Sequence, residues 1–384
     1  RNDGNSSWTF LGILSLFDPP REDSASTIAS AHQYGVGVKM VTGDNLSIAK
    51  QIAAKLGLGS HILKADALPV EGKDAKLSIE AVEKTDGFAE VFPEHKFNIV
   101  KILQKRNHIT GMTGDGVNDA PALKQADVGI AVSGATDAAM AAADLILLSP
   151  GLSVINHSIH IARKTFERMK AYAIFRIAET TRIILFMSLS IIFLNFYPIT
   201  AIMIVVLALL NDVPVMMIAY DNERVDDKPV RWDMKEVLTV ATVLGLSGVV
   251  SSFVLFFWLR SHEYSLLFIQ AMLFIKLDVA GHSTLYLTRT GRHHFWHKPY
   301  PSLKFFLPAF GSRMIGTLAA VYGIFMASIG WEYAGYIWLY SMAWWLFNDF
   351  LKVATYKILD KKIVFWPRKK YENHDNLRHT RQLG

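Results

Sequence analysis

Three short segments carry residues suited to phosphoryl chemistry. They are Met40-Val-Thr-Gly-Asp44, Phe92-Pro-Glu-His-Lys96 and Met112-Thr-Gly-Asp-Gly-Val-Asn-Asp119. Two of them follow a predicted strand and turn on a glycine, which lets the backbone approach an oxyanion and leaves N–H groups free to bind it. Together the segments predict an electrostatic clamp for phosphoryl transfer.

Five residues in these segments are suited to a part in such a clamp. Asp115 and Asp119 are hard oxygen ligands, which suit Mg²⁺ rather than a soft metal. Lys96 is placed to neutralise phosphoryl charge, while Thr42 offers a hydroxyl group and Gly43 an amide. Taken singly, Asp44 also fits a helix N-cap and Lys96 a solvated helix residue. The nine-residue run T-G-D-G-V-N-D-A-P, preceded in order by D-P-P-R, T-G-D and P-E-H-K, makes a chance occurrence negligible.

The segments lie in residues 1 to about 150, which read as a soluble α/β domain. Short apolar runs predict strands at Phe10–Phe17, Gly37–Val41, Phe88–Val91, Ile109–Met112, Val128–Val132 and Leu145–Leu148. Helical patterns lie between them, at Asp23–Tyr34, Asn45–Leu56, Pro93–Arg106 and Asp137–Ala143. This alternation predicts a parallel sheet with helices on both faces, and such folds bind ligands at the carboxyl ends of their strands.

The rest of the chain reads as membrane protein. Of the 384 residues, 51% are hydrophobic and only 19% are charged, and there is no cysteine. These values exclude a disordered tail, a disulfide scaffold and thiol chemistry. Since about 20 helical residues cross a bilayer, we predict six spans. They are about 172–194, 199–220, 237–259, 265–288, 305–330 and 334–355.

The loops between the spans predict the orientation. The connections Asn195–Pro198, Arg260–Tyr264 and Gly330–Gly335 hold one basic residue, and the opposite side holds many. The positive-inside rule therefore puts the soluble domain and the C-terminus in the cytoplasm. The same rule explains the net charge of +6 without a nucleic-acid partner. We expect a soluble domain at 1–150, a linking helix at 151–171, the spans at 172–355 and a basic tail at 356–384.

The motifs closely resemble those of the P-type ATPases. The chain looks like the haloacid-dehalogenase-like phosphorylation domain of that family followed by its last six membrane helices. Three further segments resemble those of the plasma-membrane proton-pump (type III) subfamily. They are Gly87-Phe-Ala-Glu-Val-Phe-Pro-Glu-His-Lys96, Pro150-Gly-Leu-Ser-Val-Ile155 and Phe166-Glu-Arg-Met-Lys-Ala-Tyr172. The resemblance implies a multi-pass protein of the plasma membrane that uses ATP and Mg²⁺.

The resemblance also assigns roles to residues. It implies that Asp115 and Asp119 hold Mg²⁺, that Lys96 contacts the phosphoryl group, and that Thr42 and Gly43 line the same pocket. It places the hinge to a nucleotide-binding domain, near ATP, at Asp18, Arg21, Asp44 and Asn118. The D-K-T-G-T motif that holds the phosphorylated aspartate of the family does not occur in the sequence. We therefore expect the C-terminal part of a pump, which needs its N-terminal part and does not hydrolyse ATP alone.

An ion site inside the membrane is predicted from geometry. Arg182 and Asp212 lie at similar distances before and after the turn at 195–198, so both would be about 22 Å from the outer surface and face each other. Pro214 cannot donate to the carbonyl of Leu210, which predicts a broken helix beside Asp212. A carboxylate at this depth is costly unless it is paired or hydrated, and it suits a proton carrier. In the proton pumps that the chain resembles, an Asp at this position binds the proton and an Arg at the position of Arg182 blocks its return.

Several alternatives remain open. A metal cation needs several oxygen ligands, whereas a proton needs only one acid. The first two spans offer Asp212, Asn211 and Glu179, which are fewer carboxylates than a metal-cation site needs. Glu179 could instead pair with Arg182, and Asp278, with His282 at i+4, is a rival intramembrane acid. The cargo could be Mg²⁺ or another cation, or the chain could be a non-catalytic membrane protein that keeps a phosphate-binding domain. His293, His294 and His297 fit a wet loop beside lipid headgroups better than a metal cluster.

Overall fold

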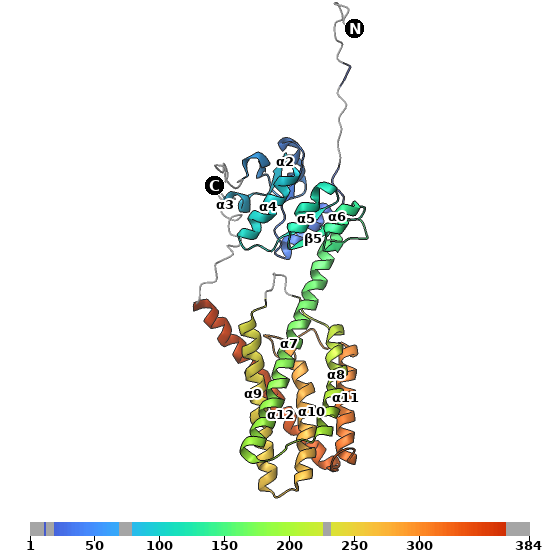
Figure 1. The fold of residues 1–384 in the computed structure, drawn as a ribbon, viewed down its shortest axis with the longest axis vertical. Coiled ribbons are helices and arrows are strands. Elements are labelled where there is room, and N and C mark those ends of the chain that lie inside the picture. The colour runs from blue at the N-terminus through green and yellow to red at the C-terminus, as the bar shows by residue number, and fades with distance from the viewer. Residues whose placement is uncertain (1–10, 13–18, 69–78, 226–231, 366–384) are drawn as a thin grey trace, which may run out of the picture. The chain divides into compact units, whose positions relative to one another are not determined.

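The chain forms two compact units. The structure is a computed structural model that describes residues 11–12, 19–68, 79–225 and 232–365. Along the chain the first unit runs to His160 and the second begins at Ile161 (Figure 1). Each unit is described by itself below.

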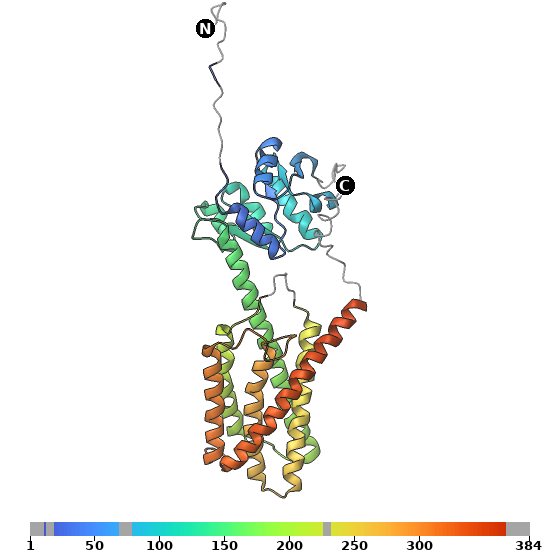
Figure 2. The same ribbon diagram turned by 180° about the vertical axis from the view of Figure 1, so that it is seen from behind.

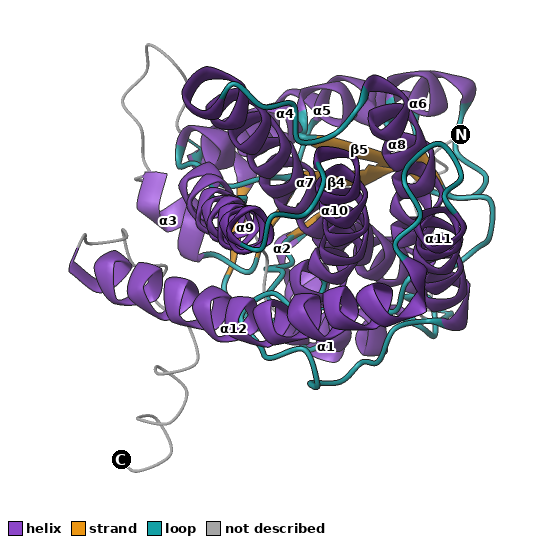
Figure 3. Cartoon of the chain, turned by 90° about the horizontal axis from the view of Figure 1, so that it is seen from below, coloured by secondary structure: helices purple, strands orange, loops and turns teal. Residues whose placement is uncertain are grey.

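The strands that the structure describes in the first unit are all parallel, as predicted. One three-stranded sheet has the order β1-β3-β2, and a second has the order β4-β5-β6 (orange in Figure 3). The strands are β1 (Met40–Val41), β2 (Ile62–Lys64), β3 (Gly87–Ala89), β4 (Gly111–Gly114), β5 (Val128–Ala131) and β6 (Leu145–Ile146). The predicted strand at Phe10–Phe17 falls outside the described residues except for residues 11–12, and β2 was not predicted.

Helices cover both faces of the first sheet, also as predicted. Successive side chains of a strand point to opposite faces. Phe88 of β3 accordingly packs in one core cluster with Ile99 of α4, and Ala89 packs in another with Ala53 of α2. The helices are α1 (Ser24–Gln33), α2 (Leu46–Lys55), α3 (Ile79–Lys84), α4 (Pro93–Lys105), α5 (Ala120–Gln125) and α6 (Asp137–Ala142), with short 3₁₀ turns η1 (Ala65–Ala67) and η2 (Val117–Asp119).

In the second unit all the regular elements that the structure describes are helices. Its elements are α7 (Ser153–Leu194, which begins in the first unit), α8 (Ala201–Met216), η3 (Met217–Tyr220), α9 (Met234–Ser261), α10 (Leu266–Thr288), α11 (Leu303–Tyr322) and α12 (Gly330–Phe365). Among the described residues, five helices are long and apolar enough to cross a membrane: α7, α8 with η3, α9, α10 and α11. The protein is therefore a multi-pass membrane protein. The sixth predicted span lies in α12. This helix carries Glu332, Asp349 and Lys352, and its crossing of the membrane stays a prediction.

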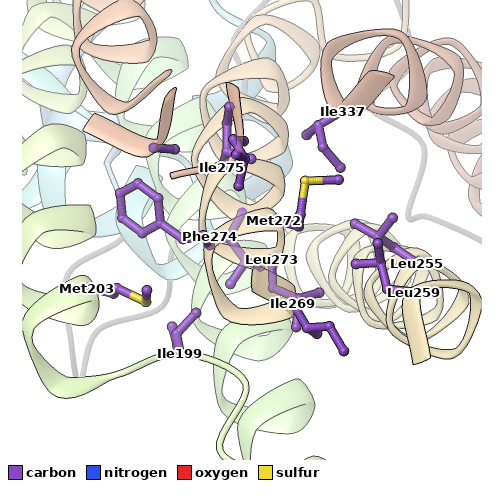
Figure 4. Packing of buried hydrophobic residues seen from close by; sticks show 14 of the residues in the cluster. Ile199, Met203, Leu255, Leu259, Ile269, Met272, Leu273, Phe274, Ile275 and Ile337 are labelled. Carbon is purple, nitrogen blue, oxygen red and sulfur yellow. The ribbon is translucent and has the colours of Figure 1, made fainter. Parts of the chain in front are cut away.

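Helix α10 lies at the centre of this bundle. It packs against α8, α9, α11 and α12, and 72% of its most apolar window is buried. Figures 1 and 2 show α12 crossing the other helices obliquely. Figure 4 shows the core, in which Met272, Phe274 and Ile275 of α10 meet Met203 of α8 and Leu255 of α9. The centre of α10 is thus screened from surrounding lipid on several sides.

Some predicted boundaries in this unit are wrong. The linking helix and the first span lie in one continuous helix, α7, so where the span begins stays a prediction. Helix α11 ends at Tyr322, before the predicted end at 330, because Gly323 adopts a left-handed conformation with φ of 76° and closes the helix. The predicted loop Gly330–Gly335 therefore lies inside α12, which continues to Phe365, beyond the predicted end of the span at 355.

Candidate functional site

The loop after β1 is held by its own side chains. The Thr42 hydroxyl donates to Asp44 Oδ2 at 2.9 Å, and the Asp44 amide donates to Thr42 Oγ1 at 3.2 Å. The N-cap of α2 is Asn45, whose side chain accepts from the Ser47 amide at 3.0 Å, so the capping interpretation of Asp44 is wrong. Gly43 and Asp44 are exposed, which leaves both open to a ligand.

Lys96 and Asp119 are in direct contact. Lys96 lies in the first turn of α4, which begins at Pro93, a residue suited to that position. Its Nζ donates to Asp119 Oδ1 at 2.6 Å, and both side chains are largely buried. Two residues from separate motifs are thereby brought together, as the sequence predicted for members of one pocket.

Asp119 also holds the loop that carries Asp115. Its Oδ2 accepts from the amides of Asp115 at 3.3 Å and Gly116 at 3.4 Å. Gly114 lies so close to this side chain that an added Cβ would be 2.6 Å from Asp119 Cβ. Glycine is therefore required at Gly114, and Asp119 positions the loop so that the exposed Asp115 follows the end of β4.

This pair of carboxylates fits a partly hydrated Mg²⁺ site. Mg²⁺ usually keeps several waters and is bound through one or two carboxylates together with substrate phosphates. The Asp115 side chain is exposed and could meet the ion directly, whereas both oxygens of the buried Asp119 already accept hydrogen bonds from Lys96 and from the Asp115 loop. Within the described residues no group of three His, Cys, Asp or Glu side chains forms an all-protein cage for a metal.

Other predicted residues of the pocket are less closely tied to it. Asp18 lies outside the described residues, and Arg21 and Asn118 are exposed. Among the described residues, no hydrogen bond or ion pair joins Thr42 or Gly43 to Lys96, Asp115 or Asp119. The structure therefore assembles Lys96, Asp115 and Asp119, and a shared pocket with Thr42 and Gly43 stays a prediction.

In the second unit the expected pairing of Arg182 with Asp212 is wrong. The Arg182 guanidinium donates to Glu179 Oε2 and, at 3.2 Å, to the carbonyl of Leu277. Residues three apart on a helix are neighbours, which favours Glu179 as the partner. Glycines also make room on that side of α7, since a Cβ on Gly248 would be 2.4 Å from Arg182 Cδ. The rival pairing of Glu179 with Arg182 is confirmed.

Asp212 faces outward in this chain. Its side chain is 57% exposed, and Arg176 Nη2 lies 3.8 Å from its Oδ1. The preceding Asn211 is buried, and its Oδ1 has no hydrogen-bond partner among the residues that the structure describes. Neighbouring residues on a helix point about 100° apart, so burial of Asn211 turns Asp212 toward the surface. The Leu210 carbonyl freed by Pro214 accepts from Ser312 Oγ and lies 3.2 Å from His282 Nε2.

A buried lysine in the bundle was missed by sequence reasoning. Lys276 of α10 is 1% exposed, and its Nζ donates to the Gly248 carbonyl at 3.1 Å and to Ser252 Oγ at 2.5 Å. Its position in the middle of an apolar span was the signal that could have revealed it. Asp278, in contrast, is fully buried, and neither carboxylate oxygen has a hydrogen-bond partner among the described residues.

Glu223 gives the second unit a predicted pH dependence. It lines a cavity of about 120 Å³ with Glu167, Lys170, Arg289 and Arg292. Burial raises the pKa of Glu223 from its ordinary 4.5 to about 8, Arg289 opposes this rise, and Asp221 and Glu167 add to it. Between these two pH values the folded state binds more protons than the unfolded state. The free energy of unfolding therefore falls as pH rises from 4.5 to about 8 and stays at its lower value above that.

We expect Glu223→Gln to be more stable than the wild type above pH 8 and to match it below pH 4.5. Denaturant unfolding of the chain in lipid nanodiscs across this range measures the difference, which grows by about 1.4 kcal/mol per pH unit at most. Two stability curves that stay parallel over the whole range would contradict the assignment.

Comparisons with known proteins agree with this architecture. Residues 4–127 match the family model of haloacid dehalogenase-like hydrolases, so the first unit has that fold. The chain is similar to "Putative cation-transporting ATPase MJ1226" of Methanocaldococcus jannaschii, with 52% identity over 360 residues. The match covers 92% of this chain and 45% of that relative, so the chain spans about half the relative's length. These findings show a haloacid dehalogenase-like domain in this chain and a similarity to a relative that is named as a cation-transporting ATPase.

Proposed function

We propose that this chain is the C-terminal part of an ATP-driven, proton-exporting P-type pump of the plasma membrane. The contact of Lys96 with Asp119 at 2.6 Å carries the proposal, because it unites two phosphate-binding motifs at the carboxyl ends of parallel strands. The similarity to a relative named as a cation-transporting ATPase, together with the membrane helices, supports the transport role.

In this proposal Asp115 and Asp119 would hold Mg²⁺, which would supply positive charge to the phosphoryl oxygens. Lys96 adds a second positive charge and fixes the Asp119 carboxylate. The Thr42 hydroxyl and the Gly43 amide are the donors we place on the remaining phosphoryl oxygens. Asp18, Arg21, Asp44 and Asn118 are proposed to border ATP at the hinge.

The nucleophile is proposed to come from outside this sequence, because D-K-T-G-T does not occur in it. We therefore expect the chain alone to bind phosphate analogues but not to hydrolyse ATP. The relative is about twice as long as the matched region, which leaves room for the nucleotide-binding and actuator domains of a pump.

Asp212 is proposed as the cargo-binding acid, with Asn211 beside it. The exposed face of α8 that carries Asp212 is where we place the further membrane helices of a longer pump, which would bury the carboxylate. Arg182, held by Glu179 and the Leu277 carbonyl, is proposed as a fixed positive charge that opposes return of the cargo. A cation other than a proton is the second candidate, because the relative's name specifies no ion.

ATP-dependent acidification of sealed vesicles that contain the complete pump tests this proposal. We expect acidification that a protonophore abolishes and that does not depend on which metal cation, besides Mg²⁺, is present. Uptake of a metal cation without acidification would overturn the proton assignment while keeping the pump class.

A further inference from the structure

We infer that Asp278 and His282 form a proton-binding pair in the middle of the membrane bundle, separate from Asp212. Asp278 lies about 18 Å along α10 from Leu266 and about 15 Å from Thr288, at a rise of 1.5 Å per residue. This is the centre of a helix whose length matches a bilayer core. The inference rests on the proposed function only for its role in transport, and proton binding by the pair does not depend on it.

Asp278 is a buried acid without a donor. Its side chain is 0% exposed, and neither carboxylate oxygen has a hydrogen-bond partner in the part of the chain that the structure describes. An isolated charged carboxylate in such surroundings is very costly, so this group needs either a proton or a nearby positive charge. The arrangement therefore calls for a proton at or beside Asp278.

The side of Asp278 that faces α11 has no room for a hydrated metal ion. Gly316 of α11 packs against the carboxyl group so closely that an added Cβ would be 2.4 Å from Oδ2 and 3.1 Å from Leu210 Cδ1. A space that cannot admit a methyl group cannot admit a hydrated cation, whereas a proton needs no volume. The described residues also offer no group of three His, Cys, Asp or Glu side chains that could hold a metal.

His282 is placed to share that proton. Its Nδ1 lies 2.8 Å from the carbonyl of Asp278 and 3.4 Å from Asp278 Oδ1, and its Nε2 lies 3.2 Å from the carbonyl of Leu210. Both ring nitrogens thus face acceptors, yet a neutral imidazole carries only one N–H. An imidazolium satisfies both and stands beside the unpartnered carboxylate.

The pair can therefore hold one proton in two ways. In the first, His282 is an imidazolium and Asp278 a carboxylate. In the second, the N–H bond at Nδ1 breaks, an O–H bond forms at Oδ1, and both groups become neutral. The transfer conserves charge within the pair, which lets a proton stay in the low-dielectric interior without creating an isolated ion.

Arg313 of α11 is near enough to act by its charge on both Asp278 and His282, but it makes no ion pair with Asp278. The remaining charged groups of the bundle have partners of their own or are exposed. On α7, Arg182 pairs with Glu179 near Gly281, and on α10 Lys276 binds the Gly248 carbonyl of α9. Arg313 of α11 lies over the Tyr286 ring at 5.0 Å, Asp349 and Lys352 of α12 pair at 3.0 Å, and Asp212 of α8 is exposed. No described side chain other than His282 makes an ion pair with Asp278.

Infrared difference spectroscopy of the whole chain in lipid nanodiscs tests the inference. As pH is varied, we expect a protonated-carboxyl band that exchanges slowly with D₂O. Asp278→Asn should remove this band, and His282→Gln should shift its titration midpoint by about one pH unit or more, a difference of about 1.4 kcal/mol between protonation states. Glu332→Gln, which changes an exposed acid of α12, should leave the band unchanged.

Gly316→Ala supplies a second variant in case Asp278→Asn does not fold. It keeps the carboxyl group but places a methyl group against it, so the band should remain and move in frequency. A band that survives Asp278→Asn, or that ignores both His282→Gln and Gly316→Ala, overturns the pair. If the band behaves as expected while the complete pump carries a metal cation, the pair stands and the proposed cargo fails.

Discussion

Lys96→Met should reduce ATP hydrolysis by the complete pump by about 100- to 1,000-fold, the range found when a donor to a developing negative charge is removed. The change deletes the charge that we place on the phosphoryl group. It also leaves the buried Asp119 carboxylate without its partner at 2.6 Å. Steady-state release of inorganic phosphate measures the loss.

Lys124→Met is the matched control, because Lys124 is an exposed lysine on α5 and loses the same charge. Its rate should stay within about twofold of the wild type, as for most surface substitutions. Equal losses in the two variants would show that Lys96 acts only through folding or net charge.

Asp212→Asn should abolish ATP-driven acidification, by about 100-fold or more, because a group that transfers protons is replaced by one that cannot titrate. Vesicle acidification by the complete pump, recorded with a pH-sensitive dye, measures the effect. The amide has nearly the same shape as the carboxyl group, so packing on α8 should be preserved.

Glu263→Gln provides the comparison for this variant, since Glu263 is an exposed acid in the loop between α9 and α10. It should acidify vesicles at the wild-type rate. Normal acidification by Asp212→Asn would show that Asp212 does not carry the proton. Asp278 would then be the remaining candidate for the acid that does.

The phosphate pocket was largely predictable from sequence because its residues occupy fixed positions relative to strand ends. Strand–helix alternation predicted the parallel strands, and the motifs predicted that Lys96 and Asp119 belong together. The number of sheets was harder to predict, since strands of two to four residues carry little periodicity. Strand β2 was missed because Ile62 and Leu63 are its only apolar residues and lie between the polar residues His61 and Lys64.

The membrane site was less predictable because depth along a helix does not fix the direction of a side chain. Arg182 and Asp212 have similar predicted depths, yet Arg182 points toward Gly248 and Gly281, and Asp212 points outward. Glycines inside α9 and α10 were the available signal, since they mark where a large side chain packs against a helix backbone. The burial of Lys276 and the approach of Gly316 to Asp278 depend on packing among several helices, which one sequence does not reveal.

Calorimetry of a phosphate analogue such as orthovanadate binding to this chain tests the central claim, that the Lys96, Asp115 and Asp119 cluster binds phosphoryl groups together with Mg²⁺. We expect binding that requires Mg²⁺ and that Asp115→Asn weakens at least tenfold, a loss of about 1.4 kcal/mol. Binding of equal strength with and without Mg²⁺, or in the wild type and Asp115→Asn, would contradict the account.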